Sequence, residues 1–413
     1  MKIVHIITRL IVGGAQENTL ITCRLLSERG HDVTLITGPS TGPEGELFQK
    51  ANSENYKVEI IDELIRPIRP LTDFIAYRKL KKRLAELKPD IVHTHSAKAG
   101  ILGRMAGYKL KCRGEPMCSP SLGQTRRSAP TRPMVVYGIH GLAFHPYQNA
   151  IVNAVYIAIE RMAAKWTDAF VSVADAMTKQ ALDTGIGAAD KFITAYSAIE
   201  EEQFINKPDE AQIKAFRAKN NIADDAVVLV TVARLFELKG HDFIIESARR
   251  LAPKFKNAIW LFVGGGNLEE KLKKDIEAAG LKERFRFTGL VPPEKIPLIL
   301  HSSDVLVHCS LREGLARAIP QAMLCGKPAI AFDLDGSREV VNDSTGRLIE
   351  AVNLEQLVAA SAELIGNQQL RQRLGETAKK TVIKKFAPDT MVDTIEQLYK
   401  RLIAGKGFRL DGW

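Results

Sequence analysis

Hydrophobic and polar positions alternate along the chain in a pattern that predicts parallel β-sheets covered by helices. Short apolar runs of strand length are separated by longer amphipathic stretches with helical periodicity. The first series of strand candidates comprises residues 2–7, 32–37, 58–61, 91–95, 135–140 and 169–174. Helical stretches lie between them, for example at residues 16–29 and 76–87.

The same alternation restarts near residue 226, which predicts a second domain of the same kind. Its strand candidates are residues 227–233, 258–264, 284–289, 305–310 and 328–332. A polar, charged join lies within residues 196–225, and an amphipathic helix is expected after Phe386. We therefore expect two doubly wound α/β domains, at residues 1–198 and 199–385, followed by a helical segment at 386–413.

Residues 109–133 do not fit this pattern, because they are rich in Pro, Ser and Arg and have almost no apolar periodicity. We interpret them as a long loop inserted in the first domain. The segment holds six basic residues and one acid, and residues 1–198 carry 26 Lys and Arg against 18 Asp and Glu. This basic half suits anionic lipid or a phosphorylated acceptor. Aromatic residues are not interleaved with the basic cluster, so we expect no nucleic-acid partner.

The composition is typical of a soluble globular protein, with 45% hydrophobic and 26% charged residues. The five scattered cysteines fit neither a disulfide framework nor zinc spacing, so we expect reduced thiols. The amino terminus has Arg9 and two glycines among its apolar residues, which favours a core strand over a signal peptide. No stretch approaches the roughly 18 apolar residues of a membrane span, and we expect a cytoplasmic protein.

Two basic residues follow the first strand of the second domain, at the edge where open α/β sheets bind ligands. They are Arg234 and Lys239. Two cations at this place suit a diphosphate, because Arg offers a planar fork and Lys a point charge. The alternative is an ordinary basic surface loop.

Glu313 follows the strand at 305–310 and suits hydrogen bonds from sugar hydroxyls. A helix is predicted around Pro320, and free amides before its start suit a phosphate oxygen. The alternative is that Glu313 caps this helix or pairs with Arg312 or Arg317.

Glycines mark two further strand-to-helix turns. Gly13 and Gly14 follow the first strand, where paired glycines let the backbone approach a ligand. The run 264–266 follows a strand of the second domain and suits either a tight turn or ligand contact. Neither has the spacing of a dinucleotide-binding motif.

His140 also lies at a strand end, where an imidazole suits a hydrogen bond to a sugar or acid–base chemistry, although most histidines only satisfy structural hydrogen bonds. Two metal sites were considered and neither is expected. His93 and His95 share one face of a strand but have no evident third ligand. Asp333 and Asp335 suit a divalent cation, but Asp335 starts an Asp-Gly turn and Arg234 and Lys239 already supply positive charge.

The order of these motifs resembles glycosyltransferase family four, a family of retaining enzymes with the GT-B fold. The glycine pair, the strand-edge His, R-x4-K-G, GGGN-x-E and Glu313 with its following helix occur in the family's order over nearly the whole chain. The resemblance implies two Rossmann-like domains that face each other across a cleft. The first would bind the acceptor, the second the nucleotide-sugar donor, and the last helix would return to the first domain.

The resemblance also implies roles for single residues. Arg234 and Lys239 would bind the donor diphosphate and stabilise the departing nucleotide, and Glu313 and His140 would lie at the donor sugar. Further donor contacts would come from the following residues: Gly13, Gly14, Gly265, Gly314, Leu315, Ala316, Gln321 and Glu339. Gln321 departs from the family, which usually has Glu at this position to hold ribose, and an amide binds hydroxyls more weakly than a carboxylate.

We therefore expect a retaining, metal-independent transferase without cofactors that moves a hexose-type sugar from a nucleotide-diphosphate sugar. Its acceptor would be lipid-linked, a polysaccharide or a cell-envelope saccharide, as in lipopolysaccharide synthesis. We also expect peripheral attachment to an anionic membrane, at its inner face. The alternatives are a nucleotide-sugar 2-epimerase of related fold and a donor-binding protein without transferase activity.

Overall fold

The computed structural model describes residues 1–39, 47–110 and 132–405. The chain divides into two compact units, Met1–Ala198 with Pro388–Trp413, and Ile199–Ala387. These divisions lie beside the boundaries expected at 198/199 and 385/386. Most of the predicted loop at 109–133 lies outside the described residues.

The first unit is built on a parallel seven-stranded sheet with the strand order β3-β2-β1-β4-β5-β6-β7. The order reverses beside β1, so the crevice at the carboxyl ends of β1 and β4 is the ligand-binding place of this sheet type. The strands are β1 (Lys2–Ile7), β2 (Asp32–Thr37), β3 (Lys57–Ile60), β4 (Ile91–His95), β5 (Met134–Ile139), β6 (Ala169–Ser172) and β7 (Phe192–Thr194).

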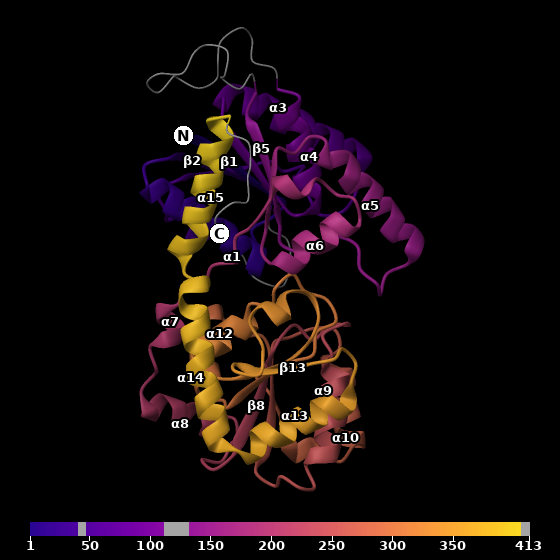
Figure 1. The fold of residues 1–413 in the computed structure, drawn as a ribbon, viewed down its shortest axis with the longest axis vertical. Coiled ribbons are helices and arrows are strands. Elements are labelled where there is room, and N and C mark those ends of the chain that lie inside the picture. The colour runs from indigo at the N-terminus through magenta and orange to yellow at the C-terminus, as the bar shows by residue number, and fades with distance from the viewer. Residues whose placement is uncertain (40–46, 111–131, 406–413) are drawn as a thin grey trace. The chain divides into compact units, whose positions relative to one another are not determined.

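Helices cover both faces of this sheet (Figure 1). The helices are α1 (Gly14–Glu28), α2 (Phe48–Asn52), α3 (Pro70–Leu87), α4 (Ala97–Tyr108), α5 (Ala150–Ala164), α6 (Asp175–Asp183) and α15 (Pro388–Ile403). Ile3 and Ile7 of β1 face a core shared with α1 and α15, whereas Val4 and Ile6 face α3 and α4. Arg29 holds α15 through ion pairs with three of its carboxylates, Asp389, Asp393 and Glu396.

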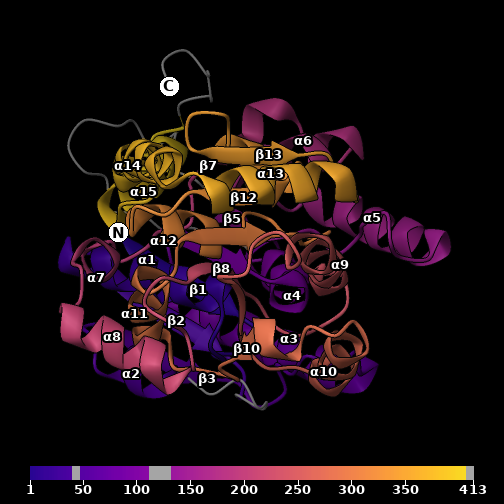
Figure 2. The same cartoon turned by 90° about the horizontal axis from the view of Figure 1, so that it is seen from below.

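The second unit has a parallel six-stranded sheet with the order β10-β9-β8-β11-β12-β13. Its strands are β8 (Val227–Val232), β9 (Ala258–Val263), β10 (Phe285–Phe287), β11 (Val305–His308), β12 (Ala329–Phe332) and β13 (Gly346–Ile349). Its helices are α7 (Glu202–Ile205), α8 (Glu210–Lys219), α9 (His241–Leu251), α10 (Glu269–Ala278), α11 (Ile296–His301), α12 (Ala318–Leu324), α13 (Leu354–Gly366) and α14 (Gln368–Lys385). Figure 2 shows α9, α10 and α13 on one side of the strands and α8, α11 and α12 on the other.

The eleven strand candidates of the sequence all correspond to strands, so the expectation of two doubly wound domains is confirmed. The pattern missed two strands, β7 and β13, which are the last strands of the two sheets. Within the described parts of the chain, no helix is long and apolar enough to cross a membrane.

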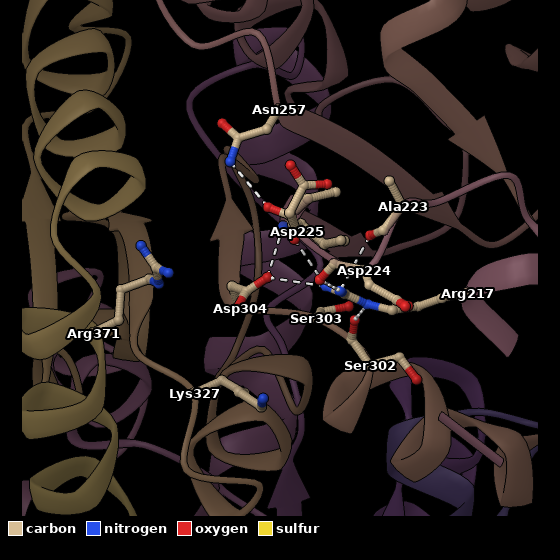
Figure 3. Close-up of polar contacts among 12 residues, drawn as sticks. Arg217, Ala223, Asp224, Asp225, Asn257, Ser302, Ser303, Asp304, Lys327 and Arg371 are labelled. Atoms are coloured by element: carbon tan, nitrogen blue, oxygen red, sulfur yellow. Dashed lines mark hydrogen bonds and ion pairs between the residues drawn. The ribbon is translucent and has the colours of Figure 1, made fainter. Parts of the chain in front are cut away.

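Arg217 of α8 joins the chain segments at the amino-terminal edge of the second sheet (Figure 3). Its guanidinium donates to the backbone carbonyls of Ser302 at 3.1 Å, Asp224 at 2.9 Å and Ala226 at 3.0 Å. It also lies 3.4 Å from Oδ2 of Asp304, which accepts from the Val228 amide at 2.8 Å. This edge is opposite the one where ligands bind, so the network stabilises the fold.

Replacing Arg217 by methionine is expected to lower the free energy of unfolding by about 2–3 kcal/mol, because several carbonyls lose a charged donor. The melting temperature, followed by scanning calorimetry, checks the loss. Arg249→Met is the matched control: Arg249 is exposed and, among the described residues, pairs with Glu246 on its own helix, so its substitution should change the melting temperature little. Equal effects of the two substitutions would contradict the assigned role.

Candidate active site

The main candidate site lies at the carboxyl ends of β8 and β11, which are neighbours where the strand order of the second sheet reverses. Lys239 comes from the loop after β8 and Glu313 from the loop after β11. Their side chains meet, with Nζ of Lys239 2.5 Å from Oε1 of Glu313. The two residues that the sequence placed at separate strand ends are therefore in direct contact, and Glu313 pairs with Lys239 rather than serving only as a helix cap.

Glu313 is ionised at neutral pH. Desolvation by burial raises its pKa, but the interactions with His308 and Lys239 outweigh this and lower the pKa to about 2. Nε2 of His308 lies 3.6 Å from the carboxylate, beyond hydrogen-bond length. The site thus presents a fixed carboxylate, which can accept hydrogen bonds, beside a fixed ammonium.

Arg234 lies in a loop that is packed against the glycine run 264–266. The amide of Leu235 donates to the carbonyl of Gly265 at 3.0 Å. A Cβ at Gly264 would lie 2.2 Å from the Ala233 carbonyl, and one at Gly266 would lie 2.2 Å from the Leu235 carbonyl. These two glycines are therefore required by packing, and they fix the backbone on both sides of Arg234. Gly265 has more room, so its predicted donor contact stays a prediction.

Gly240 fixes the backbone next to Lys239. It has a φ of +73°, and a Cβ there would lie 2.0 Å from the carbonyl oxygen of Cys309. Gly240 thus lets the loop after β8 lie directly against the end of β11. Close approach of these two loops brings Lys239 to Glu313.

We expect Gly240→Ala to lower the sugar transfer that the family resemblance implies by tenfold or more. The added Cβ forces apart the two loops, which costs about 1–3 kcal/mol. The matched control is Gly326→Ala, which has a φ of +70° but no atom within 4 Å of its added Cβ. Both variants should lose stability from backbone strain of about 1–2 kcal/mol, and only the first should lose activity. A normal initial rate for Gly240→Ala would contradict this role.

The loop after Glu313 is held by the segment that follows β12. The amide of Glu313 donates to Oδ2 of Asp335 at 2.6 Å, and the amide of Gly336 donates to the carbonyl of Gly314 at 3.0 Å. Asp333 accepts from Nε of Arg338 at 2.8 Å. Both aspartates of the considered metal pair thus have structural partners, and Asp335 acts as a brace for the Glu313 loop.

The remaining candidates of the second unit surround this loop. Leu315 and Ala316 are buried, and α12 begins two residues later with Pro320 in its first turn. Gln321 is partly exposed on the same helix. Glu339 ends the 3-10 turn Asp335–Glu339, and its carbonyl accepts from Lys385 at 2.9 Å. The predicted phosphate and ribose contacts of these residues stay predictions.

Three candidates lie in the first unit. Gly13 immediately precedes α1 and Gly14 is its first residue. A Cβ at Gly13 would meet only the end of the Gln16 side chain, at 2.9 Å, so packing does not require glycine there. His140 follows β5, and its Nε2 lies 3.0 Å from Nδ1 of His95. Their approach to the donor stays a prediction, because the other candidates belong to the second unit.

The roles of two residues, His5 and Asp335, were not predicted from the sequence. His5 lies beside His93 and His95, so these two histidines do have a third potential metal ligand, contrary to the sequence interpretation. In the sequence, His5 is visible as a histidine inside the first apolar strand. Its closeness to His93 and His95 follows only from the pairing of β1 with β4. The brace by Asp335 was also missed, although its Asp-Gly turn was recognised.

Comparison with known proteins decides the family. Residues 12–202 match the family profile described as Glycosyltransferase Family 4, and residues 212–381 match that of Glycosyl transferases group 1. An uncharacterized glycosyltransferase of Methanocaldococcus jannaschii is 30% identical over 271 residues, which are 64% of this chain and 67% of that protein. The chain belongs to glycosyltransferase family 4.

Relatives of this family 4 member are glycosyltransferases. The UDP-Gal:alpha-D-GlcNAc-diphosphoundecaprenol alpha-1,3-galactosyltransferase of Escherichia coli is 28% identical, with 98% of both chains covered. The capsular polysaccharide biosynthesis glycosyltransferase CapM of Staphylococcus aureus is 20% identical, with 92% of both chains covered. These similarities identify the chain as a nucleotide-sugar glycosyltransferase and do not support the epimerase or the inactive donor-binding protein.

Solved structures give the fold of this family 4 member. The Anabaena HepE complex with UDP-glucose superposes with a TM-score of 0.78 at 19% identity, over 97% of this chain and 99% of that one. WaaG, a glycosyltransferase involved in lipopolysaccharide biosynthesis, gives a TM-score of 0.70 at 18% identity, over 98% of this chain and 100% of that one. The predicted GT-B fold is thus confirmed.

Proposed function

We propose that this enzyme transfers a hexose from a UDP-sugar to a saccharide linked to polyprenyl diphosphate, with retention of configuration and without a metal ion. The observation that carries the proposal is the contact of Lys239 with Glu313 at the reversal point of the donor-side sheet, next to the braced loop of Arg234. The acceptor class is supported by the Escherichia coli relative, which aligns over nearly its full length.

The charges of this site divide the work of donor binding. Lys239 and Arg234 would neutralise the diphosphate and stabilise the negative charge that grows on the departing nucleotide, which is the stage where fixed cations help most. Glu313, ionised because its pKa is about 2, would accept hydrogen bonds from the sugar hydroxyls. Two cations at the diphosphate would make a divalent metal unnecessary.

Retention is supported by the stereochemistry of the relative. UDP-galactose carries an α-linked sugar, and the Escherichia coli enzyme, an α-1,3-galactosyltransferase, forms an α linkage, so an enzyme of this kind keeps the configuration. Among the described residues of the site, the carboxylate of Glu313 contacts Lys239. This pair fits a mechanism in which fixed charges stabilise the leaving group.

The test is transfer from UDP-galactose or UDP-glucose to a synthetic polyprenyl-diphosphate GlcNAc acceptor, with product configuration read by NMR. We expect an α-linked product at equal rates with EDTA or added Mg²⁺. A β-linked product would contradict retention, and loss of turnover in EDTA that Mg²⁺ restores would contradict metal independence. Release of free sugar or epimer without disaccharide would contradict the proposed transferase activity.

A membrane-bound acceptor requires contact with the membrane, and α3 offers a surface for it. Four large apolar side chains at its start are exposed: Ile68 (74%), Leu71 (82%), Phe74 (57%) and Ile75 (45%). Basic side chains flank them, and Arg78, Lys81 and Lys82 line one groove together with Phe74. Exposed apolar residues beside lysines and arginines are typical of helices that lie in the interface of an anionic membrane.

Vesicle sedimentation tests this surface. We expect binding to vesicles that contain phosphatidylglycerol, less binding at high salt, and at least tenfold weaker binding for the double variant Leu71→Ser, Phe74→Ser. The matched control is Ile151→Ser on α5, which is 75% exposed and has no basic neighbour within one helical turn. Absent binding at low salt, or equal loss in the control, would overturn the assignment of α3.

A further inference from the structure

Helix α5 is anchored in the first unit mainly at its carboxyl end. Its buried residues are Glu160, Ala163 and Ala164, which lie in its last two turns. Glu160 pairs with the buried Arg104 of α4 at 2.7 Å. Figures 1 and 2 both show α5 projecting from the first unit beyond α4. The first turns of α5 therefore remain exposed or only partly buried.

The exposed part of α5 is apolar along one face. Ile151 is 75% exposed, Val152 41%, Val155 53% and Met162 46%. Spacings of three, four and seven residues place these side chains on one side of a helix. Together they form an apolar stripe, which runs for roughly 16 Å at a rise of 1.5 Å per residue. A contiguous exposed apolar surface of this kind marks a binding site for an apolar partner.

Almost no charge accompanies the apolar stripe. Residues 141–159 contain no Asp, Glu, Lys or Arg, although these four types make up 26% of the whole chain. The first cation after this stretch is Arg161, whose Nε donates to the carbonyl of Thr184 at 2.6 Å. The groove of α3, in contrast, is lined by basic side chains. The surface of α5 thus complements an uncharged chain and does not suit anionic headgroups.

The start of α5 is tied to the loop that carries His140. The amide of His145 donates to Oδ1 of Asn153 at 3.2 Å, and Nδ2 of Asn153 donates to the carbonyl of His145 at 2.8 Å. Nε2 of Gln148 donates to the same Oδ1 at 2.9 Å. His140 follows β5, and its Nε2 lies 3.0 Å from Nδ1 of His95 at the end of β4. A short, internally bonded loop therefore joins the apolar stripe to the edge of the sheet where ligands bind.

We propose that the apolar stripe of α5 binds the polyprenyl chain of the acceptor. This inference rests on the proposed function, which assigns a saccharide on polyprenyl diphosphate as the acceptor. Such a molecule needs polar groups at its sugar and an uncharged apolar surface at its lipid. The first unit supplies both, at the ends of β4 and β5 and on α5. In this arrangement α3 contacts the headgroups of the membrane and α5 contacts the lipid of the substrate.

The acyl chains of the membrane and a second copy of this chain are the competing partners of the apolar stripe. Helices that lie in an anionic membrane carry basic side chains beside their apolar face, and α5 has none next to Ile151 or Val155. A second copy would make the oligomeric state depend on these two side chains. Both alternatives are outcomes that the experiments distinguish.

Photocrosslinking of the full-length protein tests the proposal without relying on transfer. The probe is a GlcNAc-diphosphate acceptor whose polyprenyl chain carries a diazirine, supplied in nonionic detergent. We expect mass spectrometry to find the label within residues 150–162, and an excess of unlabelled acceptor to remove it. Label confined to other segments, or no label that the acceptor competes away, would overturn the proposal. Label on α5 without any sugar transfer would contradict the proposed function alone.

Acceptor kinetics link the apolar stripe to turnover. The double variant Ile151→Ser, Val155→Ser should raise KM for the polyprenyl acceptor by about tenfold or more, because burial of a large apolar side chain is worth about that factor, with kcat nearly unchanged. An acceptor with the same GlcNAc-diphosphate on a short alkyl chain should have the same KM with the variant and the wild type.

Ile60→Ser is the matched control for these kinetics. Ile60 is 53% exposed on β3, at the edge of the same sheet and three strands away from β5, so both KM values should stay unchanged. An equal rise of KM for the two acceptors, or the same rise in the control, would contradict lipid binding by α5.

The double variant also separates the competing partners. Its binding to phosphatidylglycerol vesicles without polyprenyl lipid should equal that of the wild type, and analytical ultracentrifugation without lipid should give both proteins the same mass. Loss of binding to these vesicles would assign α5 to the membrane in general. A change from dimer to monomer would assign it to a second copy. Either result would overturn the proposal.

Discussion

Replacing Lys239 by alanine is expected to lower kcat/KM for sugar transfer about a hundred- to a thousandfold, the usual loss when one preorganised electrostatic group is removed from a transition state. Lys239 is a fixed charge: its Nζ lies 2.5 Å from Glu313, and only 18% of its side chain is exposed. In the proposed mechanism it would therefore need no reorganisation when charge develops on the leaving diphosphate. Steady-state kinetics with saturating acceptor measure the loss.

The matched control is Lys271→Ala, since Lys271 belongs to the same unit and also pairs with one carboxylate, Asp275 at 2.7 Å, but is exposed. Its kcat/KM should stay within about twofold of wild type. A loss below tenfold for Lys239→Ala would contradict a role for this lysine in stabilising the leaving group.

Glu313→Gln separates two contributions of the same contact. The amide keeps the shape of the carboxylate but removes its charge, so the placement of Lys239 should weaken, and with it the proposed binding of the sugar. Because the side chains of Glu313 and Lys239 touch, the two substitutions should not act independently. The double variant Lys239→Ala, Glu313→Gln should lose less transition-state stabilisation, measured as kcat/KM, than the sum of the losses of the two single variants. Additive losses would show that the two residues act independently, in contradiction to the structure.

The sequence predicted much of the donor-side site because its residues stand at strand ends. Arg234, Lys239 and Glu313 each follow a regular apolar run, and the carboxyl ends of parallel strands share one edge of a sheet. The sequence could not show that Lys239 and Glu313 touch. That contact depends on the close approach of Gly240 to Cys309, which follows from the pairing of β8 with β11.

The failures of the sequence argument have the same origin. His93 and His95 were examined along one strand, and their neighbour His5 is 88 residues away in sequence; only the register of β1 on β4 brings them together. The missed strand β7 is short, with three residues at the edge of its sheet. Asp335 was assigned to a turn, whereas its side chain accepts from the Glu313 amide.

Replacing Arg104 by methionine is expected to lower the free energy of unfolding of the first unit by about 3–5 kcal/mol, because it leaves a buried carboxylate without its partner. Arg104 of α4 is fully buried and donates from Nη2 to Oε2 of Glu160 at 2.7 Å and from Nε to the Gly100 carbonyl at 2.9 Å. Its guanidinium also lies over the ring of Tyr137, 3.9 Å from the centroid. Urea unfolding measures the loss.

The double variant Arg104→Met, Glu160→Leu distinguishes a requirement for the ion pair from a requirement for filled volume. Removing both charges spares the cost of burying them, so this variant should recover most of the stability lost by the single substitution. Arg83→Met is the matched control, since Arg83 also pairs with a glutamate of the same unit, Glu59, but is 37% exposed; it should lose less than about 1 kcal/mol. A double variant as unstable as Arg104→Met would show instead that the guanidinium's contacts with Gly100 and Tyr137, and not the unpaired charge, hold α4 on the sheet.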